Sequence, residues 1–119
     1  MKNNRCLLIV ESPKASMDRA MSQLKKPSGK YKGMTIIAFP DFETLGKVVT
    51  GARLELLAVI RQRKPKSIQE LARFVKRDFK NVYQDVKFLA EFGLIQLIEG
   101  GPRRAAAPVA RFSELVLAA

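Results

Sequence analysis

The residues of this sequence that are best suited to bind another molecule lie between Asp78 and Phe92. At about 100° per helical residue, one side of this segment is apolar and consists of Phe79, Val82, Val86 and Leu89. The opposite side is polar and consists of Lys80, Tyr83, Gln84 and Lys87, with Asn81 at its flank near the N-terminal end. Lysines can hold phosphate, and amide and hydroxyl groups can hydrogen-bond to base edges. This face therefore suits double-stranded DNA, and an ordinary solvated helix face is the alternative.

Other kinds of chemistry lack their usual residues. The 119-residue chain has no histidine, the commonest general base and metal ligand, and one cysteine, Cys6, which excludes an internal disulfide. Cys6 lies in an apolar run and is expected to be an inert buried thiol. Asp78 and Asp85 are better explained as a helix cap and a partner for a nearby arginine or lysine than as a catalytic pair. We expect no catalytic residue, cofactor or metal site, and hence no enzyme.

The charge of the chain also favours a polyanionic partner. Lys and Arg number 22 against 11 acidic residues, a net charge of +11, and the excess is spread over residues 1–50 (+5) and 51–119 (+6). A basic protein without such a partner is the alternative. The hydrophobic fraction of 47% excludes a disordered chain. The apolar runs are too short for a membrane span, and no signal peptide is evident. We therefore expect a cytoplasmic, nucleoid-associated protein.

Clear start and stop signals surround the polar face. Ser67 and Glu70 match a capping box before an apolar stripe that ends at Val75. A turn at residues 76–78 precedes the helix to Phe92, with Asp78 as its cap, and Gly93 suits its C-terminal end. Strands are then expected at 94–99 and 105–117, the second interrupted near Pro108, with a basic turn between them.

The preceding part of the chain predicts further elements. Strands are expected at 5–10 and 34–39, separated by a helix that begins at Ser12-Pro13. Asp41 is expected to cap the next helix, and Thr50 a buried helix to about Arg63. The apolar stripe of the first helix consists of Met17, Ala20, Met21 and Leu24, and that of the second consists of Phe42, Leu45, Val48 and Val49.

The order of these elements predicts the fold. Two helices joined by a short turn and followed by a strand pair are the outline of a winged helix-turn-helix, in which the second helix can lie in a major groove. The predicted class is α+β, with residues 1–40 as a strand-helix-strand extension and 41–119 as the winged-helix domain. The extension is too short for its own core, so it is expected to pack on a second subunit or another protein.

The residues from Leu71 to Ile95 also resemble a known pattern. Leu71-Ala72, Asp78, Val82, Asp85-Val86, Leu89 and Gly93-Leu94-Ile95 are spaced as in winged-helix regulators of the MarR/ArsR type. The chain from Phe39 onward is similar to the HVO_A0114-type DNA-binding regulators. That similarity is carried by Phe39 through Leu45, Thr50-x2-Arg53-x2-Leu56-Leu57, Ser67-Ile68-x-Glu70-Leu71-Ala72 and Arg77-Asp78-x3-Val82-x2-Asp85-Val86.

This resemblance implies a sequence-specific transcriptional regulator, a repressor that acts as a homodimer on double-stranded DNA. The polar face would read or hold the major groove, and Arg73, Lys76 and Arg77 would grip phosphates near the turn. Arg77 can alternatively pair with Asp85 or Glu70. Arg103 and Arg104 would act from the wing, although Ala105 to Ala107 and Phe112-Ser113 replace the group's more basic wing pattern. Two other functions stay open: an antitoxin-like autoregulator that binds a toxin through its N-terminal part, and a winged-helix protein-interaction module.

Overall fold

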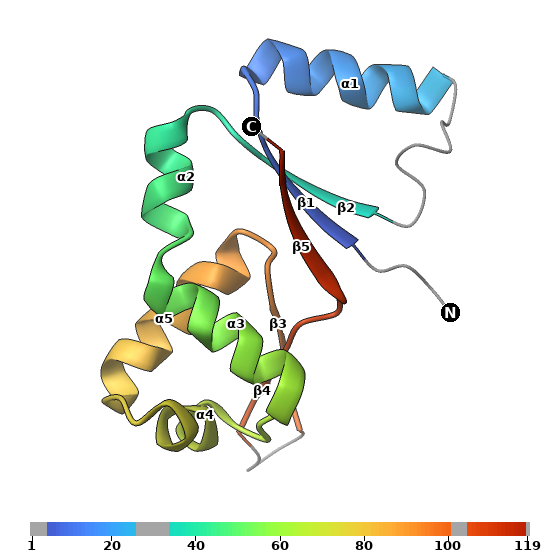
Figure 1. Cartoon of the computed structure of the whole chain (residues 1–119). Coiled ribbons are helices and arrows are strands. Elements are labelled where there is room, and N and C mark those ends of the chain that lie inside the picture. The colour runs from blue at the N-terminus through green and yellow to red at the C-terminus, as the bar shows by residue number, and fades with distance from the viewer. Residues whose placement is uncertain (1–4, 26–33, 101–104, 119) are drawn as a thin grey trace. The chain divides into compact units, whose positions relative to one another are not determined.

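The computed structural model describes residues 5–25, 34–100 and 105–118 and contains both helices and strands. Within these ranges lie five helices and five strands in two small sheets, which is compatible with the expected α+β class (Figure 1). The chain divides into two compact units, residues 1–47 with 112–119 and residues 48–111. Among the described residues, every helix is too short or too polar to cross a membrane.

The first unit is organised around a three-stranded parallel sheet. Its strands are β1 (Arg5–Val10), β2 (Met34–Phe39) and β5 (Glu114–Ala118), in the order β2-β1-β5. The central strand β1 buries Cys6 and Leu8, whereas the residues that alternate with them, such as Leu7 and Ile9, are only partly buried. Cys6 is fully buried there, as expected, and burial raises the pKa of its thiol.

Helix α1 (Pro13–Lys25) follows β1 and begins where the sequence predicts. Ser12 Oγ accepts a hydrogen bond from the amide of Ala15, at 3.1 Å. Glu11 Oε1 accepts from Arg19 Nη2 at 2.7 Å and from Ser16 Oγ at 2.6 Å, and these bonds lower the pKa of Glu11. None of the residues of α1 is buried, and Met17 and Leu24 are 69% and 80% exposed. The apolar stripe of α1 is therefore not part of the core of this chain.

Helices α2 (Phe42–Val48) and α3 (Gly51–Arg63) begin at the predicted caps. Asp41 Oδ1 accepts from the amide of Thr44 at 2.7 Å, which lowers the pKa of Asp41. Thr50 Oγ1 accepts from the amide of Arg53 at 3.2 Å. The expected burial of Phe42 is wrong, because this residue is mostly exposed at the first position of α2.

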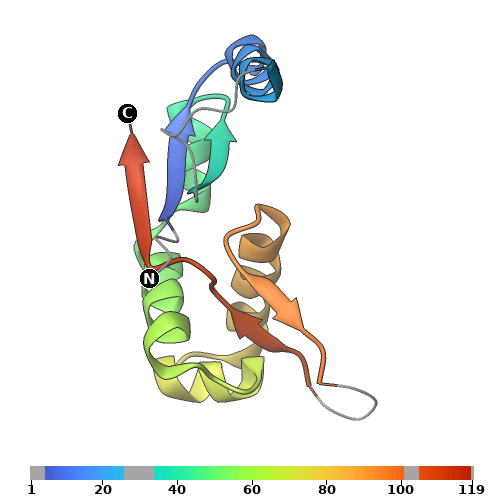
Figure 2. The same ribbon diagram turned by 90° about the vertical axis from the view of Figure 1, so that its right-hand side faces the viewer.

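The second unit contains α3, α4 (Ile68–Val75), α5 (Phe79–Glu91), β3 (Gln96–Ile98) and β4 (Ala107–Val109). Ser67 caps α4 as predicted, since its Oγ accepts from the amide of Glu70 at 3.0 Å, while Glu70 reaches back to the amide of Lys66. The strands β3 and β4 pair antiparallel (Figure 2). The core consists of one side of each helix and the residues that follow α5: Leu56, Leu57, Ile60, Ile68, Leu71, Ala72, Val82, Val86, Leu89, Leu94 and Ile95.

The expectation of one returning strand over 105–117 is wrong. Its first part is β4, and its second part is β5, which pairs in parallel with β1. The interruption lies at 110–113 and not at Pro108, which is buried in β4 opposite Leu97. A two-stranded ladder tolerates proline where the missing N–H would point away from the partner. As a consequence, the chain passes from the first unit to the second after residue 47 and returns to the first unit after residue 111. The sequence analysis predicted a single boundary, after residue 40.

The end of α5 depends on Gly93, as the sequence predicts. Gly93 has a φ of +82° and donates its amide to the carbonyl of Ala90, while Leu94 donates to the carbonyl of Leu89. This double hydrogen-bond pattern ends a helix with a residue in the left-handed conformation. It turns the chain from α5 toward β3 and brings Leu94 into the core.

Replacing Gly93 by alanine is expected to lower the free energy of unfolding by about 1 kcal/mol, because an L-residue is strained at this φ. The matched control is Gly51→Ala in the same unit, where a methyl group meets no atom within 4 Å and φ is not positive. Urea unfolding measures both changes. Equal losses in the two variants would contradict a special role for the backbone of Gly93.

Candidate nucleic-acid interface

The polar face predicted for 78–92 is the exposed side of α5. The side chains of Lys80, Asn81, Tyr83, Gln84 and Lys87 are all exposed. On the opposite side, Val82, Val86 and Leu89 are completely buried against the rest of the second unit. The rotation of α5 about its axis is therefore set by the core, and it leaves two cations, two amides and a phenol at the surface.

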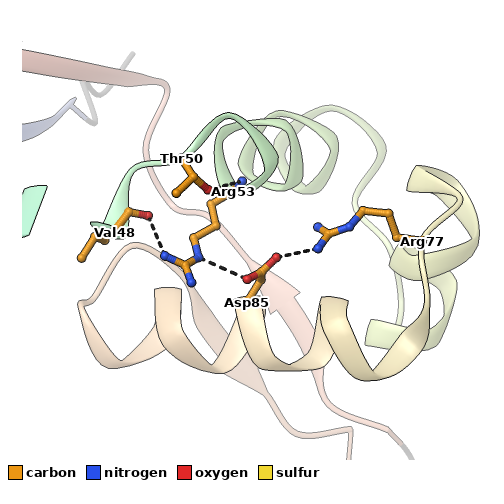
Figure 3. A network of polar contacts seen from close by, with 5 residues as sticks. All are labelled: Val48, Thr50, Arg53, Arg77 and Asp85. Atoms are coloured by element: carbon orange, nitrogen blue, oxygen red, sulfur yellow. Dashed lines mark hydrogen bonds and ion pairs between the residues drawn. The ribbon is translucent and has the colours of Figure 1, made fainter. Parts of the chain in front are cut away.

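A polar network connects α5 to two other parts of the unit (Figure 3). Asp85 Oδ1 accepts a hydrogen bond from Arg53 Nε at 3.2 Å, and Asp85 Oδ2 accepts from Arg77 Nη2 at 2.9 Å. Arg53 also donates from Nη1 to the carbonyl of Val48 at 3.4 Å. The side chains of Asp85 and Arg53 are only 16% and 19% exposed, so water weakens their attraction less than at an open surface. The network joins the start of α3 and the α4–α5 turn to the middle of α5.

This network bears on the two interpretations of Arg77. The sequence favoured a phosphate contact and left pairing with Asp85 or Glu70 open. In the structure the guanidinium of Arg77 is paired with Asp85. Arg77 therefore helps to position α5, and its charge is already shared with a carboxylate.

The other two cations near the turn lie at the surface. Arg73 is largely exposed, and its Nη2 is 3.9 Å from Glu70 Oε2, at the outer limit of an ion pair. Lys76 is exposed and ends α4 in a left-handed conformation, with φ of +56°. Both can reach an anion in front of the turn. The predicted wing residues Arg103 and Arg104 lie outside the described residues.

Two details of α5 differ from the sequence prediction. Asp78 occupies the cap position, but its side chain makes no capping hydrogen bond. Phe79 was expected on the core side, yet it is 49% exposed and its ring stacks on Tyr83 with centroids 5.8 Å apart. Phe79 is the first residue of α5, and the buried residues of this helix begin three positions later, at Val82. Phe88 is only partly exposed, and Arg53 Cζ lies 4.1 Å from its ring centroid.

A second group of cations was not recognised in the sequence. Residues 61–66 contain four cations and no acid, and the sequence there was interpreted only as the end of a helix. Arg61, Lys64 and Lys66 line a cavity of about 500 Å³ together with β4 residues such as Pro108. The density of positive charge in this connection is the signal that could have identified it.

The exposed side chains of this surface are suited to contact an anion and to form hydrogen bonds. Lysine and arginine side chains attract phosphate, and the amides of Asn81 and Gln84 can donate and accept hydrogen bonds. Among the described residues, no group of three His, Cys, Asp or Glu side chains could hold a metal ion.

We expect Asp85→Ala and Asp85→Asn each to lower the free energy of unfolding by about 2 kcal/mol, because both leave two partly buried guanidinium groups without their carboxylate. The control is Glu91→Ala, which removes an exposed acid from the same helix and should change stability by less than about 0.5 kcal/mol. Chemical denaturation checks this. An Asp85→Asn variant as stable as the parent would show that the charge of Asp85 is not needed.

Comparison with known proteins identifies the family of this chain. The family model described as HVO_A0114 matches residues 48–117, which include the whole of the second unit. The match extends through most of β5 and covers more than half of the chain. Neither the curated proteins nor the solved structures contain a match to the chain. The protein belongs to the HVO_A0114 family.

Proposed function

We propose that this protein is a sequence-specific regulator of transcription that binds double-stranded DNA, and that it represses by occupying a promoter. The observation that carries the proposal is the exposed face of α5, where two lysines lie beside two amides and a tyrosine. Phosphate contacts position a protein on DNA, and amide groups distinguish bases in the major groove. Both kinds of group are present on one helix.

The arrangement around α5 supports a winged helix-turn-helix. Helix α4, a turn at 76–78 and α5 occur in the order of such a motif, and the β3–β4 hairpin follows in the position of a wing. In this architecture the second helix enters the major groove. The contacts of Asp85 with Arg53 and Arg77 hold α5 at a defined angle, as an inserted helix requires.

We assign roles by side-chain chemistry. Lys80 and Lys87 hold phosphates beside the groove, and Asn81, Tyr83 and Gln84 face base edges. Arg73 and Lys76 contact the backbone from the turn, and Arg103 and Arg104 contribute from the wing. Residues 48–111 contain 13 lysines and arginines against six acids, which supports a polyanionic partner.

The exposed apolar face of α1 supports a protein partner in addition to DNA. Met17, Met21 and Leu24 are each at least half exposed, and a face of this kind commonly covers another protein. We propose that the partner is a second copy, because regulators of this type bind pseudo-palindromic sites as dimers. The same face favours a second candidate function, an antitoxin-like autoregulator whose N-terminal part binds a toxin.

Binding to duplex DNA should depend steeply on salt. A dimer that neutralises about six phosphates gives a slope of about −5 in a plot of log K against log salt, and affinity falls about a thousandfold between about 50 and 200 mM salt. Fluorescence anisotropy with a labelled duplex measures the slope. A slope near zero would contradict DNA binding and favour a protein partner.

Substitutions on α5 should separate the two kinds of contact. Lys80→Ala is expected to weaken binding to all duplexes, because it removes a phosphate contact, whereas Gln84→Ala should relax preference at one base position. Lys14→Ala on α1 and Gln62→Ala on α3 make the same changes at exposed positions on other helices and should leave base preference unchanged. Equal losses on selected and random duplexes from both α5 variants would contradict these roles.

A further inference from the structure

An apolar hollow lies beside the polar face of α5. It has a volume of about 300 Å³ and is bounded by the start of α4, the outer side of α5, β3 and the residues before β4. Its lining is largely apolar and includes Ile68, Leu97 and Phe79, together with Tyr83 and Lys87 of α5. The hollow lies entirely within the second unit, and it shares Tyr83 and Lys87 with the polar face.

Phe79 is the residue of this hollow that the fold does not explain. Val82, Val86 and Leu89 already supply the buried side of α5 and are fully covered. Phe79 is half exposed, and its ring is oriented by stacking on Tyr83 with an interplanar angle of 29°. A phenylalanine that is held in place but left half exposed is available for an apolar contact with a partner.

The proposed function specifies what that apolar contact can be. Unmodified base pairs present hydrogen-bond donors and acceptors in the major groove, and their apolar group there is the C5-methyl of thymine. Lys87 Nζ lies 5.9 Å from the centroid of the Tyr83 ring, which places a positive charge beside the hollow, where a phosphate of the bound strand would be attracted. The apolar hollow could therefore accept the methyl group of thymine, while Lys87 attracts a phosphate of the same strand.

We propose that Phe79, oriented by Tyr83, recognises the C5-methyl group of a thymine in the DNA site. This inference rests on the proposed function. It adds a base preference that arises from apolar contact, whereas the amides of Asn81 and Gln84 recognise bases by hydrogen bonding. Phe79 is thus a specificity residue at the N-terminal end of α5.

Deoxyuridine provides the test, because it pairs as thymine does and lacks only the methyl group. A duplex selected from a random pool by the full-length protein is resynthesised with each thymine replaced in turn by deoxyuridine. At one or more positions the replacement should weaken binding by about fourfold, the factor expected when one buried methyl-sized group is lost. Equal affinity for the thymine and deoxyuridine forms at every position would overturn the inference.

Variants assign the effect to Phe79. Phe79→Ala should bind the thymine and deoxyuridine forms equally, and Phe79→Leu should keep part of the difference because it keeps an apolar side chain. Phe42→Ala removes a similarly exposed phenylalanine from α2 and should retain the full difference. Thermal unfolding of each variant shows that it is folded. A fourfold preference that persists in Phe79→Ala would assign the methyl contact to another residue and overturn the inference.

The two proposals fail in different ways. If the protein selects a sequence and binds it with a steep salt slope but ignores the thymine methyl, the inference about Phe79 is wrong and the proposed function stands. If no duplex is enriched and binding does not depend on salt, the proposed function is wrong, and the inference falls with it.

Discussion

The carboxylate of Asp85, shared between Arg53 and Arg77, is the interaction on which the arrangement of the second unit depends. Arg53 lies near the start of α3, and Arg77 lies in the turn before α5, so one side chain joins three segments separated in sequence. Apolar packing alone sets which side of α5 is buried, but it allows neighbouring helices to slide. Directional hydrogen bonds at 3.2 and 2.9 Å restrict that freedom.

The same network explains why a basic protein contains an acid so close to its candidate binding surface. Two guanidinium groups that were brought together without a carboxylate would repel each other. With Asp85 between them they become structural, and their charge is withdrawn from the surface. The cations left exposed on and near α5 are Lys80, Lys87, Lys76 and Arg73, and these are the ones placed to meet an anion in solution.

Much of the fold could be predicted from local signals in the sequence. The caps Ser12, Asp41, Thr50 and Ser67 and the terminator Gly93 act within a few residues of their own position, so the sequence nearby is sufficient to identify them. The exposed face of α5 was predicted for a similar reason, because helical periodicity determines which side chains share a side. The destination of β5 could not be predicted, because an apolar run fits either an antiparallel hairpin or a parallel partner distant in sequence.

The role of Arg77 and the exposure of Phe79 lay beyond the sequence for a different physical reason. An arginine can reach a carboxylate or an external phosphate with equal ease, and the sequence does not reveal that Asp85 lies within hydrogen-bonding distance of Arg77. Phe79 follows the apolar periodicity, but periodicity does not reveal that the core does not extend to the first residue of α5. Because burial ends there, Phe79 adds an apolar edge to a polar face. A departure from the sequence pattern is therefore most informative about binding where, as at Phe79, an apolar side chain is exposed beside polar groups.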